Sequence, residues 1–420
     1  MSEPTTARAA PTAAGIAARH ALGWLVAANA VGVGLAALLL WPDLNDALGP
    51  LTYGRWVPLH LDWQLYGGCA LPLVAVLLQW CLGERPPSGV AQARVAVGLW
   101  SLALLLGGVA WLGGGSSGKM FLEWHGWTRP LLPLAMVVLW AVLASHAWRR
   151  RGAPDRSGHA GRAAVLLVLL AVPGVLYWSA GRGVYPSVNP DSGGATGTRL
   201  LLSTLGIVVI FGLLAEILGL ARRRSGPWFW GYAGFSALVG AAIEHGNASH
   251  HEAAEILGLA TLLGWIPLAW FHFTGGQGLA AARRWWAAAY AWWVLLVVLG
   301  LLNFLPGFSE RLKFTNAMVG HAHLAMAGLV TSANLAVLQE LGAGRRFRRF
   351  WLWQIACAVQ IAALAFLGWG ELGHGAELFY SAPWTQAIYG LRLVAGLGML
   401  GASVAWWCDA RGATNEGVAT

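Results

Sequence analysis

Two histidines lie close together in an apolar stretch of the chain. His321 and His323 are separated by one alanine in the run "MVGHAHLAMAGLV", residues 318–330. Ionisable side chains are costly in an apolar membrane-spanning segment and usually mark function there. On an α-helix, residues i and i+2 lie about 200° apart, so the two imidazoles point to opposite sides of the helix. They cannot readily ligate one ion together, and the spacing predicts two neighbouring cofactors, one on each face.

The composition is that of a polytopic membrane protein. Of the 420 residues, 57% are hydrophobic and only 11% are charged, which excludes an ordinary soluble domain. The net charge of +9 does not indicate nucleic-acid binding, because the basic residues form short clusters between apolar runs. We predict an all-α fold with twelve transmembrane helices, near residues 19–41, 56–82, 90–113, 128–148, 162–181, 198–221, 228–245, 252–273, 284–305, 316–341, 350–370 and 386–408.

One transmembrane domain is predicted over residues 19–408. Residues 1–18 are polar and rich in Ala and Pro, and we expect them to form a flexible cytoplasmic tail. Residues 409–420 are expected to form a second cytoplasmic tail. Both termini are assigned to the cytoplasm because most of the 27 Lys and Arg residues then fall in inner loops and tails, as the positive-inside rule requires.

A third histidine is expected at the depth of the pair. His60 would lie about one turn inside the second span, and His321 and His323 one to two turns inside the tenth. With His245 at the outer end of the seventh span, four imidazoles from three helices fall in the outer third of the membrane. Imidazole is a common axial ligand of haem iron, and a helical bundle offers an apolar slot for the ring. One of the pair could complete a bis-His haem with His60, and the other could hold a second haem with one open position. The alternative is that these histidines form hydrogen bonds between helices.

Four segments resemble those of a known family. The family is subunit I of the haem-copper oxidase superfamily. Its second helix is similar to "WVPLHLDWQLYGG", and its link between helices three and four is similar to "GSSGKMFLEWHGWTRPLLPL". Its tenth helix is similar to "NAMVGHAHLAMAGLVTS", and its last helix to "AIYGLRLVAGLGMLGASVAWW". The similarity is closest to the C-type (cbb) cytochrome c oxidases and the nitric oxide reductases. It covers most of the chain, and the second- and tenth-helix motifs are its specific part.

This resemblance implies cofactors and partners. His60 and His323 would ligate a low-spin haem of b type, and His321 would be the proximal ligand of a high-spin haem. In the family that second haem faces copper or a non-haem iron, and O2 or NO is reduced between them. Electrons would come from an outer-side cytochrome c or a copper-bearing subunit, within a complex that includes other membrane subunits of a bacterial-type inner membrane.

The second metal site departs from the family pattern. The family takes one histidine from helix six and an adjacent pair from helix seven, but Thr198 or Arg199 stands at the first position and Glu244 with His245 at the second. The helix-seven tyrosine of the C-type oxidases is also missing. Either a metal still binds, since carboxylate with imidazole suits iron, or the site is lost and these groups form a hydrated outer mouth, which we favour. The possible ligands are Glu244, His245, His250 and His251.

Three functions are compatible with these patterns. The first is a respiratory haem subunit that passes electrons from an outer donor toward O2 or NO. The second is a non-catalytic haem relay or gas sensor without the copper site, and the third is a twelve-helix transporter. The transporter is disfavoured because the ionisable groups cluster in the outer third and the two halves of the chain show no resemblance. Candidate partners for haem propionates are Arg129, Arg182, Arg199 and Arg392.

Overall fold

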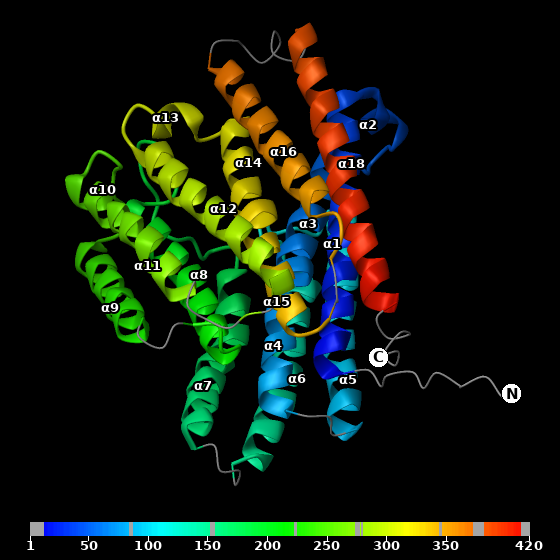
Figure 1. Cartoon of the computed structure of the whole chain (residues 1–420). Helices are drawn as coiled ribbons and strands as arrows, with labels where there is room; N and C mark the ends of the chain where they lie inside the picture. Colours follow the sequence, from blue (N-terminus) through cyan, green and yellow to red (C-terminus); the bar gives the residue numbers. More distant parts are fainter. Residues whose placement is uncertain are drawn as a thin grey trace, which may run out of the picture. The chain divides into compact units, whose positions relative to one another are not determined.

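The chain is helical throughout the part that the structure describes. This computed structural model (Figure 1) describes residues 12–83, 87–151, 156–221, 225–273, 278, 280–343, 347–372 and 382–412. Within these ranges no strand occurs, and the one β-type contact is an isolated antiparallel bridge between Val188 and Ala195. The predicted all-α class is therefore confirmed for the described residues.

Eleven helices of the described chain are long and apolar enough to cross a membrane. They match eleven of the twelve predicted spans, which supports an integral membrane protein. The span predicted at 228–245 forms helix α9 (Gly226–Ile243), which has 18 residues but is not among the eleven. Its first half, "GPWFWGYAGF", is rich in Gly and Trp, and this composition lowers its apolarity.

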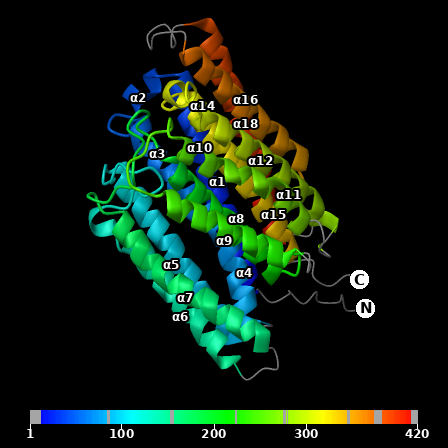
Figure 2. The same cartoon turned by 90° about the vertical axis from the view of Figure 1, so that its left-hand side faces the viewer.

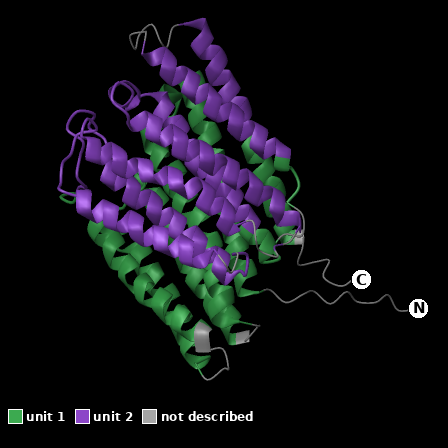
Figure 3. Cartoon of the chain, turned by 60° about the vertical axis from the view of Figure 1, so that its left-hand side comes forward, with its two compact units in different colours: residues 1–184, 337–350, 396–420 green, residues 185–336, 351–395 purple. Residues whose placement is uncertain are grey.

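The chain divides into two compact units. Figure 3 shows them in two colours. Unit 1 contains residues 1–184, 337–350 and 396–420, and unit 2 contains residues 185–336 and 351–395.

The first helix begins earlier than expected. Helix α1 starts at Ala13, inside the segment 1–18 that was predicted to be a flexible tail. Its start is fixed by Thr12, whose hydroxyl accepts a hydrogen bond from the Gly15 amide at 3.0 Å, as an N-cap residue does. Residues 1–11 and 413–420 lie outside the described part, and so do most of the two predicted tails.

Unit 1 is organised around its first helix. Its elements are α1 (Ala13–Leu40), α2 (Asp43–Ala47), α3 (Tyr53–Asp62), η1 (Trp63–Cys69), α4 (Ala70–Leu82), α5 (Pro87–Leu112), η2 (Gly126–Thr128), α6 (Leu131–Arg149) and α7 (Arg156–Ser179). Helix α1 packs against α3, η1, α4 and α5, and α6 contacts both α5 and α7. Figure 2 shows α5, α6 and α7 side by side. On α7, Leu167 and Val168 are 71% and 69% exposed, as expected of a face that contacts lipid.

Unit 2 contains the second half of the predicted spans. Its elements are α8 (Gly197–Ile217), α9, α10 (Ala253–Ala260), η3 (Thr261–Gly264), α11 (Trp265–Phe273), α12 (Ala280–Phe304), α13 (Ser309–Leu312), α14 (Asn316–His323), η4 (Leu324–Val330) and α16 (Phe350–Glu371). Helices α15 (Thr331–Glu340) and α18 (Pro383–Gly412) contribute to both units. The core of unit 2 includes Phe229, Trp265 and Trp293.

Close helix contacts in unit 2 depend on glycine. Gly212 of α8 faces the ring of Phe229 on α9, and a Cβ at this position would overlap the ring. Gly320 of α14 faces α16, where a Cβ would lie 3.2 Å from Leu364 Cβ. Small residues allow helices to approach closely in membrane proteins. The Gly320 contact holds α14, the helix that carries His321 and His323, close against α16.

Candidate functional site

His321 lies at a helix contact in unit 2. It belongs to α14, and its ring faces α12, where a Cβ on Gly300 would lie 3.3 Å from His321 Cε1. Its Nδ1 is buried and has no hydrogen-bond partner among the described residues. The hypothesis that this histidine forms a hydrogen bond between helices therefore gains no support at Nδ1.

His323 has different surroundings from its neighbour. Its Nδ1–H donates a hydrogen bond to the carbonyl of Val319, one turn earlier, at 2.8 Å. A carbonyl oxygen can only accept, so the ring proton lies on Nδ1 and the lone pair lies on Nε2. This is the tautomer that a metal ligand needs when it binds through Nε2.

His60 shows the same arrangement in unit 1. It lies on α3, and its Nδ1–H donates to the carbonyl of Ala28 on α1 at 2.8 Å. The ring lies close against α1 because residue 32 is glycine, where a Cβ would be 2.7 Å from His60 Cε1. The hydrogen bond again places the lone pair on Nε2.

Both histidine-bearing helices change geometry directly after these residues. Helix α3 passes at Trp63 into the seven-residue π-helical segment η1, and α14 passes at Leu324 into the seven-residue π-helical segment η4. Segments of π-helix are rare and occur frequently at functional sites. The sequence gives no signal for them, because neither segment contains proline and each continues an apolar run.

The predicted pairing of His60 with His323 joins residues of different units. His60 belongs to unit 1, and His321 and His323 belong to unit 2. The shared haem therefore stays a prediction.

Asp62 is an ionisable residue that the sequence analysis missed. It follows His60 by two residues on α3 and is fully buried. Among the described residues its carboxyl oxygens have no well-aligned hydrogen bond, and the groups that act on the carboxyl are the carboxylate and the backbone amide of Glu123. A buried carboxyl group with so little hydrogen bonding is rare and calls for an explanation. Its position beside a candidate haem ligand could have singled it out in the sequence.

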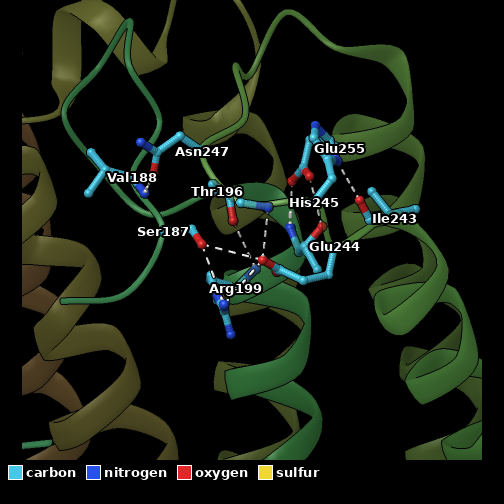
Figure 4. Close-up of polar contacts among 11 residues, drawn as sticks. Ser187, Val188, Thr196, Arg199, Ile243, Glu244, His245, Asn247 and Glu255 are labelled. Carbon is cyan, nitrogen blue, oxygen red and sulfur yellow. Dashed lines mark hydrogen bonds and ion pairs between the residues drawn. The ribbon is translucent and has the colours of Figure 1, made fainter. Parts of the chain in front are cut away.

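Glu244 is engaged by an arginine. In Figure 4, Arg199 Nη2 lies 3.1 Å from Glu244 Oε1. The same oxygen accepts hydrogen bonds from the Ser187 hydroxyl at 3.3 Å and the Gly246 amide at 3.2 Å. Arg199 is a candidate propionate partner, and Glu244 is expected either to bind a metal or, as we favour, to line a hydrated mouth. The structure brings the two together as an ion pair.

His245 turns toward a different carboxylate. Its Nε2 lies 3.2 Å from Glu252 Oε2, and its Nδ1–H donates to the carbonyl of Ile243 (Figure 4) at 2.6 Å. That carbonyl, and secondarily the carboxylates of Glu252 and Glu255, raise the pKa of His245 above its usual value. Glu244 and His245 therefore have separate partners, although they are adjacent in the chain.

Thr198 is also engaged. Its amide and hydroxyl donate to the two carboxyl oxygens of Glu255 at 2.6 and 2.8 Å, and Glu255 is 1% exposed. This contact satisfies an otherwise unpaired amide at the start of α8 and ties α8 to α10. Thr198 stands where the family has a metal-ligand histidine, and here it is part of a helix cap.

His250 and His251 meet two carboxylates that the sequence analysis did not include. Both Nε2 atoms face Glu310 Oε1, at 2.8 and 3.0 Å, and Asp191 lies close to the two rings. A hydrogen bond from its own backbone amide, and then the adjacent His250 ring, lower the pKa of Glu310 to about 2. Asp191 and Glu310 lie about 60 residues from the histidines along the chain, so only the folded chain brings them together.

The other predicted propionate partners have separate surroundings. Arg129 donates from Nε to the carbonyl of Tyr177 at 2.8 Å and stacks on the Tyr177 ring at 4.1 Å, so it joins α6 to α7. Arg182 is exposed. Arg392 is 6% exposed and lies 5.4 Å from the Tyr389 ring centroid. Burial of a guanidinium inside a predicted span makes Arg392 the most unusual of the four.

Comparison with known proteins does not extend these observations. No protein-family model matches the sequence, and none of the curated proteins matches it. The similarity to haem-copper oxidases therefore rests on the quoted segments alone.

The residues present fit axial haem ligation. His60 and His323 each have Nδ1 held by a backbone carbonyl, which is the usual way that a protein fixes the tautomer and ring orientation of a metal-bound histidine. His321 has a buried Nδ1 without a hydrogen-bond partner among the described residues. Gly32 and Gly300 leave room beside two of the rings, at places where a Cβ would lie only 2.7 and 3.3 Å away.

Proposed function

We propose that this chain is an integral membrane haem protein of the haem-copper oxidase and nitric oxide reductase type. His60 and His323 would hold a low-spin haem of b type, and His321 would hold a second, high-spin haem. One observation carries the proposal. Two helices far apart in sequence each bear a histidine whose Nδ1 is fixed by a backbone carbonyl, and each passes within three residues into a π-helical segment.

The carbonyl contacts define what the histidines do. Each keeps the ring proton on Nδ1 and holds the plane of the imidazole, so that Nε2 offers its lone pair in a fixed direction. A haem, when bound, supplies one-electron transfer and, at an open axial position, binding of a diatomic gas. His321 suits the five-coordinate role, because it lies on the opposite side of α14 from His323.

The electron donor would be an outer-side cytochrome c or a copper-bearing subunit. This assignment follows from the family resemblance and from the predicted depth of the three histidines, near the outer surface. A chain that holds its haems near that surface can accept electrons from a soluble or peripheral donor. Other membrane subunits are expected to share the complex.

The partners of Glu244 and His245 favour a form of this proposal in which the chain has no second metal. Arg199 engages Glu244 and Glu252 engages His245, so these two side chains do not converge on a common ligand position. With Thr198 bound to Glu255, none of the three positions that correspond to the family's metal ligands is arranged for a metal. The chain would then relay electrons or bind a gas without reducing it between two metals.

Optical spectroscopy of the purified chain tests the proposal. We expect two b-type haems per chain in the reduced spectrum, one of which shifts when CO is added. His323→Ala and His60→Ala should each remove the low-spin signal, and His321→Ala should remove the CO-sensitive signal. His60→Met keeps a possible iron ligand and should shift the low-spin band rather than abolish it.

A matched control separates ligation from misfolding. His20 of α1 is hydrogen-bonded to the Ser101 hydroxyl at 2.7 Å, and His20→Ala should leave both haem signals in place. Absence of haem from the wild-type chain would refute the proposal and return the transporter to first place. Loss of the same haem in His321→Ala and His323→Ala would contradict the opposite-face assignment. One equivalent of copper or non-haem iron with NO or O2 turnover would contradict the hypothesis that the chain lacks a second metal.

A further inference from the structure

Four potential metal ligands converge in the connections between the helices of unit 2. Asp191 comes from the segment before α8, His250 and His251 from the segment between α9 and α10, and Glu310 from α13. Each of Asp191, His250 and His251 offers a ligand atom, and these atoms lie within 4.8 Å of one another. The Nε2 atoms of the two histidines lie 2.8 and 3.0 Å from one oxygen of Glu310.

The buried nitrogen of His250 is the atom that calls for a ligand. Its side chain is 0% exposed. Its Nε2 lies 2.8 Å from Glu310 Oε1, but among the described residues it has no well-aligned hydrogen bond, so the Glu310 contact satisfies it only in part. A buried ring nitrogen left wholly without a hydrogen bond would cost about 1–3 kcal/mol. An ion placed between the nitrogen and the carboxylate would satisfy both.

Three of the four groups are also held from behind. Asn189 Nδ2 lies 2.8 Å from His250 Nδ1, the Ser249 hydroxyl donates to Asp191 Oδ2, and the Gly307 amide donates to Glu310 Oε2 at 2.7 Å. The rings of His250 and His251 lie against each other, with centroids 4.4 Å apart. Such outer contacts orient metal ligands in proteins and are part of the site.

We propose that Asp191, His250, His251 and Glu310 form a binding site for one divalent transition-metal ion of the Zn²⁺ class. Two imidazoles and two carboxylates match the nitrogen and oxygen ligands of Zn²⁺, and the two negative charges balance the ion. Ligands at about 2.0–2.2 Å from a tetrahedral ion lie roughly 3.3 Å from each other. The observed separations of 2.8 and 3.0 Å therefore need only a small expansion.

Asn189 has a positioning role in this site. Its Oδ1 accepts from the Asp191 amide at 3.1 Å, which points Nδ2 at His250 Nδ1 and leaves the ring proton on Nε2. Binding of an ion at Nε2 requires the ring proton on Nδ1, and the amide of Asn189 must then turn so that Oδ1 accepts that proton, which gives up the bond from the Asp191 amide.

This site does not depend on the proposed haem function. It excludes Glu244 and His245, which were the first candidates for a second metal, and it replaces them with Asp191 and Glu310. An ion here would tie together three segments of unit 2: the one before α8, the one between α9 and α10, and α13.

Calorimetry with Zn²⁺ on the full-length chain, freed of any histidine tag and of bound metal by chelation, tests the proposal. We expect about one equivalent of Zn²⁺ to bind, and Co²⁺ in its place to give the strong visible bands of a tetrahedral site. His251→Ala and Asp191→Asn should each weaken Zn²⁺ binding by at least about 100-fold, because outer contacts alone change affinity by about 10–100-fold. Asn189→Leu should fall in that smaller range.

His245→Ala is the matched control. His245 lies in the same connection and is 50% exposed, much as His251 is 55% exposed, so both variants change a surface histidine. We expect His245→Ala to alter Zn²⁺ affinity less than about twofold and both variants to keep the thermal unfolding midpoint and the haem content of the wild type. Equal losses in both variants, or no binding at micromolar Zn²⁺ by a folded wild-type chain, would overturn the proposal. Loss of haem with retained Zn²⁺ binding would count only against the proposed haem function.

Discussion

Arg199 and Glu244 form an ion pair that joins α8 to the end of α9. Nη2 of the arginine lies 3.1 Å from Oε1 of the glutamate, and the side chains are 41% and 25% exposed. The pair occupies the place where the family resemblance led us to expect a metal ligand. Its presence accounts for both residues without a metal.

A double-mutant cycle on Arg199→Gln and Glu244→Gln measures the strength of this pair. Partly exposed ion pairs are worth little, so we expect a coupling energy of about 0.2–1 kcal/mol from equilibrium unfolding in mixed micelles. Added salt should reduce it. Arg182→Gln changes an exposed arginine and should show no coupling to Glu244→Gln. A coupling energy near zero at low salt would mean that the pair does not persist in solution.

Glu255 is expected to stabilise unit 2 by capping α8. Its two oxygens accept from the amide and hydroxyl of Thr198, so Glu255→Ala leaves both donors buried without a partner. Hydrogen bonds to a charged group are worth about 1.5–3 kcal/mol, and we expect a loss of this size in the free energy of unfolding. Glu252→Ala, three residues earlier and 43% exposed, should cost about 1 kcal/mol or less. Similar losses in the two variants would argue against the cap.

The helices could be predicted because each is encoded locally. An apolar run of about 20 residues identifies a span without reference to the rest of the chain, and the positions of His60, His321 and His323 on their helices follow from it. The span that departs from the prediction, α9, is the one whose first half contains Gly and Trp in place of aliphatic residues. Helix starts were less predictable, because Thr12 decides the start of α1 through one hydrogen bond.

The partners of the site residues could not be predicted, because they depend on contacts between distant segments. Glu244 and His245 are adjacent, but one pairs with Arg199 and the other with Glu252. Asp191 and Glu310 gave no sequence signal, since single carboxylates in loops are common. The π-helical segments were also missed, because the apolar pattern of a π-helix over seven residues does not differ from that of an α-helix.

Gly212 should be intolerant of a side chain. A Cβ at this position overlaps the Phe229 ring, and overpacking of a close contact costs about 1–3 kcal/mol. Gly206 lies on the same helix with nothing within 4 Å of its Cβ position. Gly206→Ala is therefore expected to be neutral or to stabilise by up to about 1 kcal/mol, from helix propensity. Thermal unfolding of Gly212→Ala and Gly206→Ala in detergent distinguishes the packing effect from a general effect of alanine on α8.

Glu123 should make stability depend on pH. It is 4% exposed, and burial raises the pKa of its carboxyl above the usual 4.5. The folded state then holds its proton to higher pH than the unfolded state, so this contribution to stability is largest below pH 4.5 and falls as pH rises through the folded pKa. The fall is at most about 1.4 kcal/mol per pH unit. Unfolding in micelles from acid to neutral pH should show it in the wild type and not in Glu123→Gln.

Gly32 provides the sharpest test of the His60 geometry. A Cβ here would lie 2.7 Å from His60 Cε1 and 3.0 Å from Nδ1, so Gly32→Ala must displace the ring and weaken its hydrogen bond to Ala28. We expect a destabilisation of about 1–3 kcal/mol and a shifted or weakened low-spin haem band, with the CO-sensitive band unchanged. Gly34, two residues later on α1, has nothing within 4 Å of its Cβ position, and Gly34→Ala should alter neither band. If Gly32→Ala loses stability but keeps the wild-type low-spin spectrum, the contact between α1 and His60 is structural and His60 is not a haem ligand.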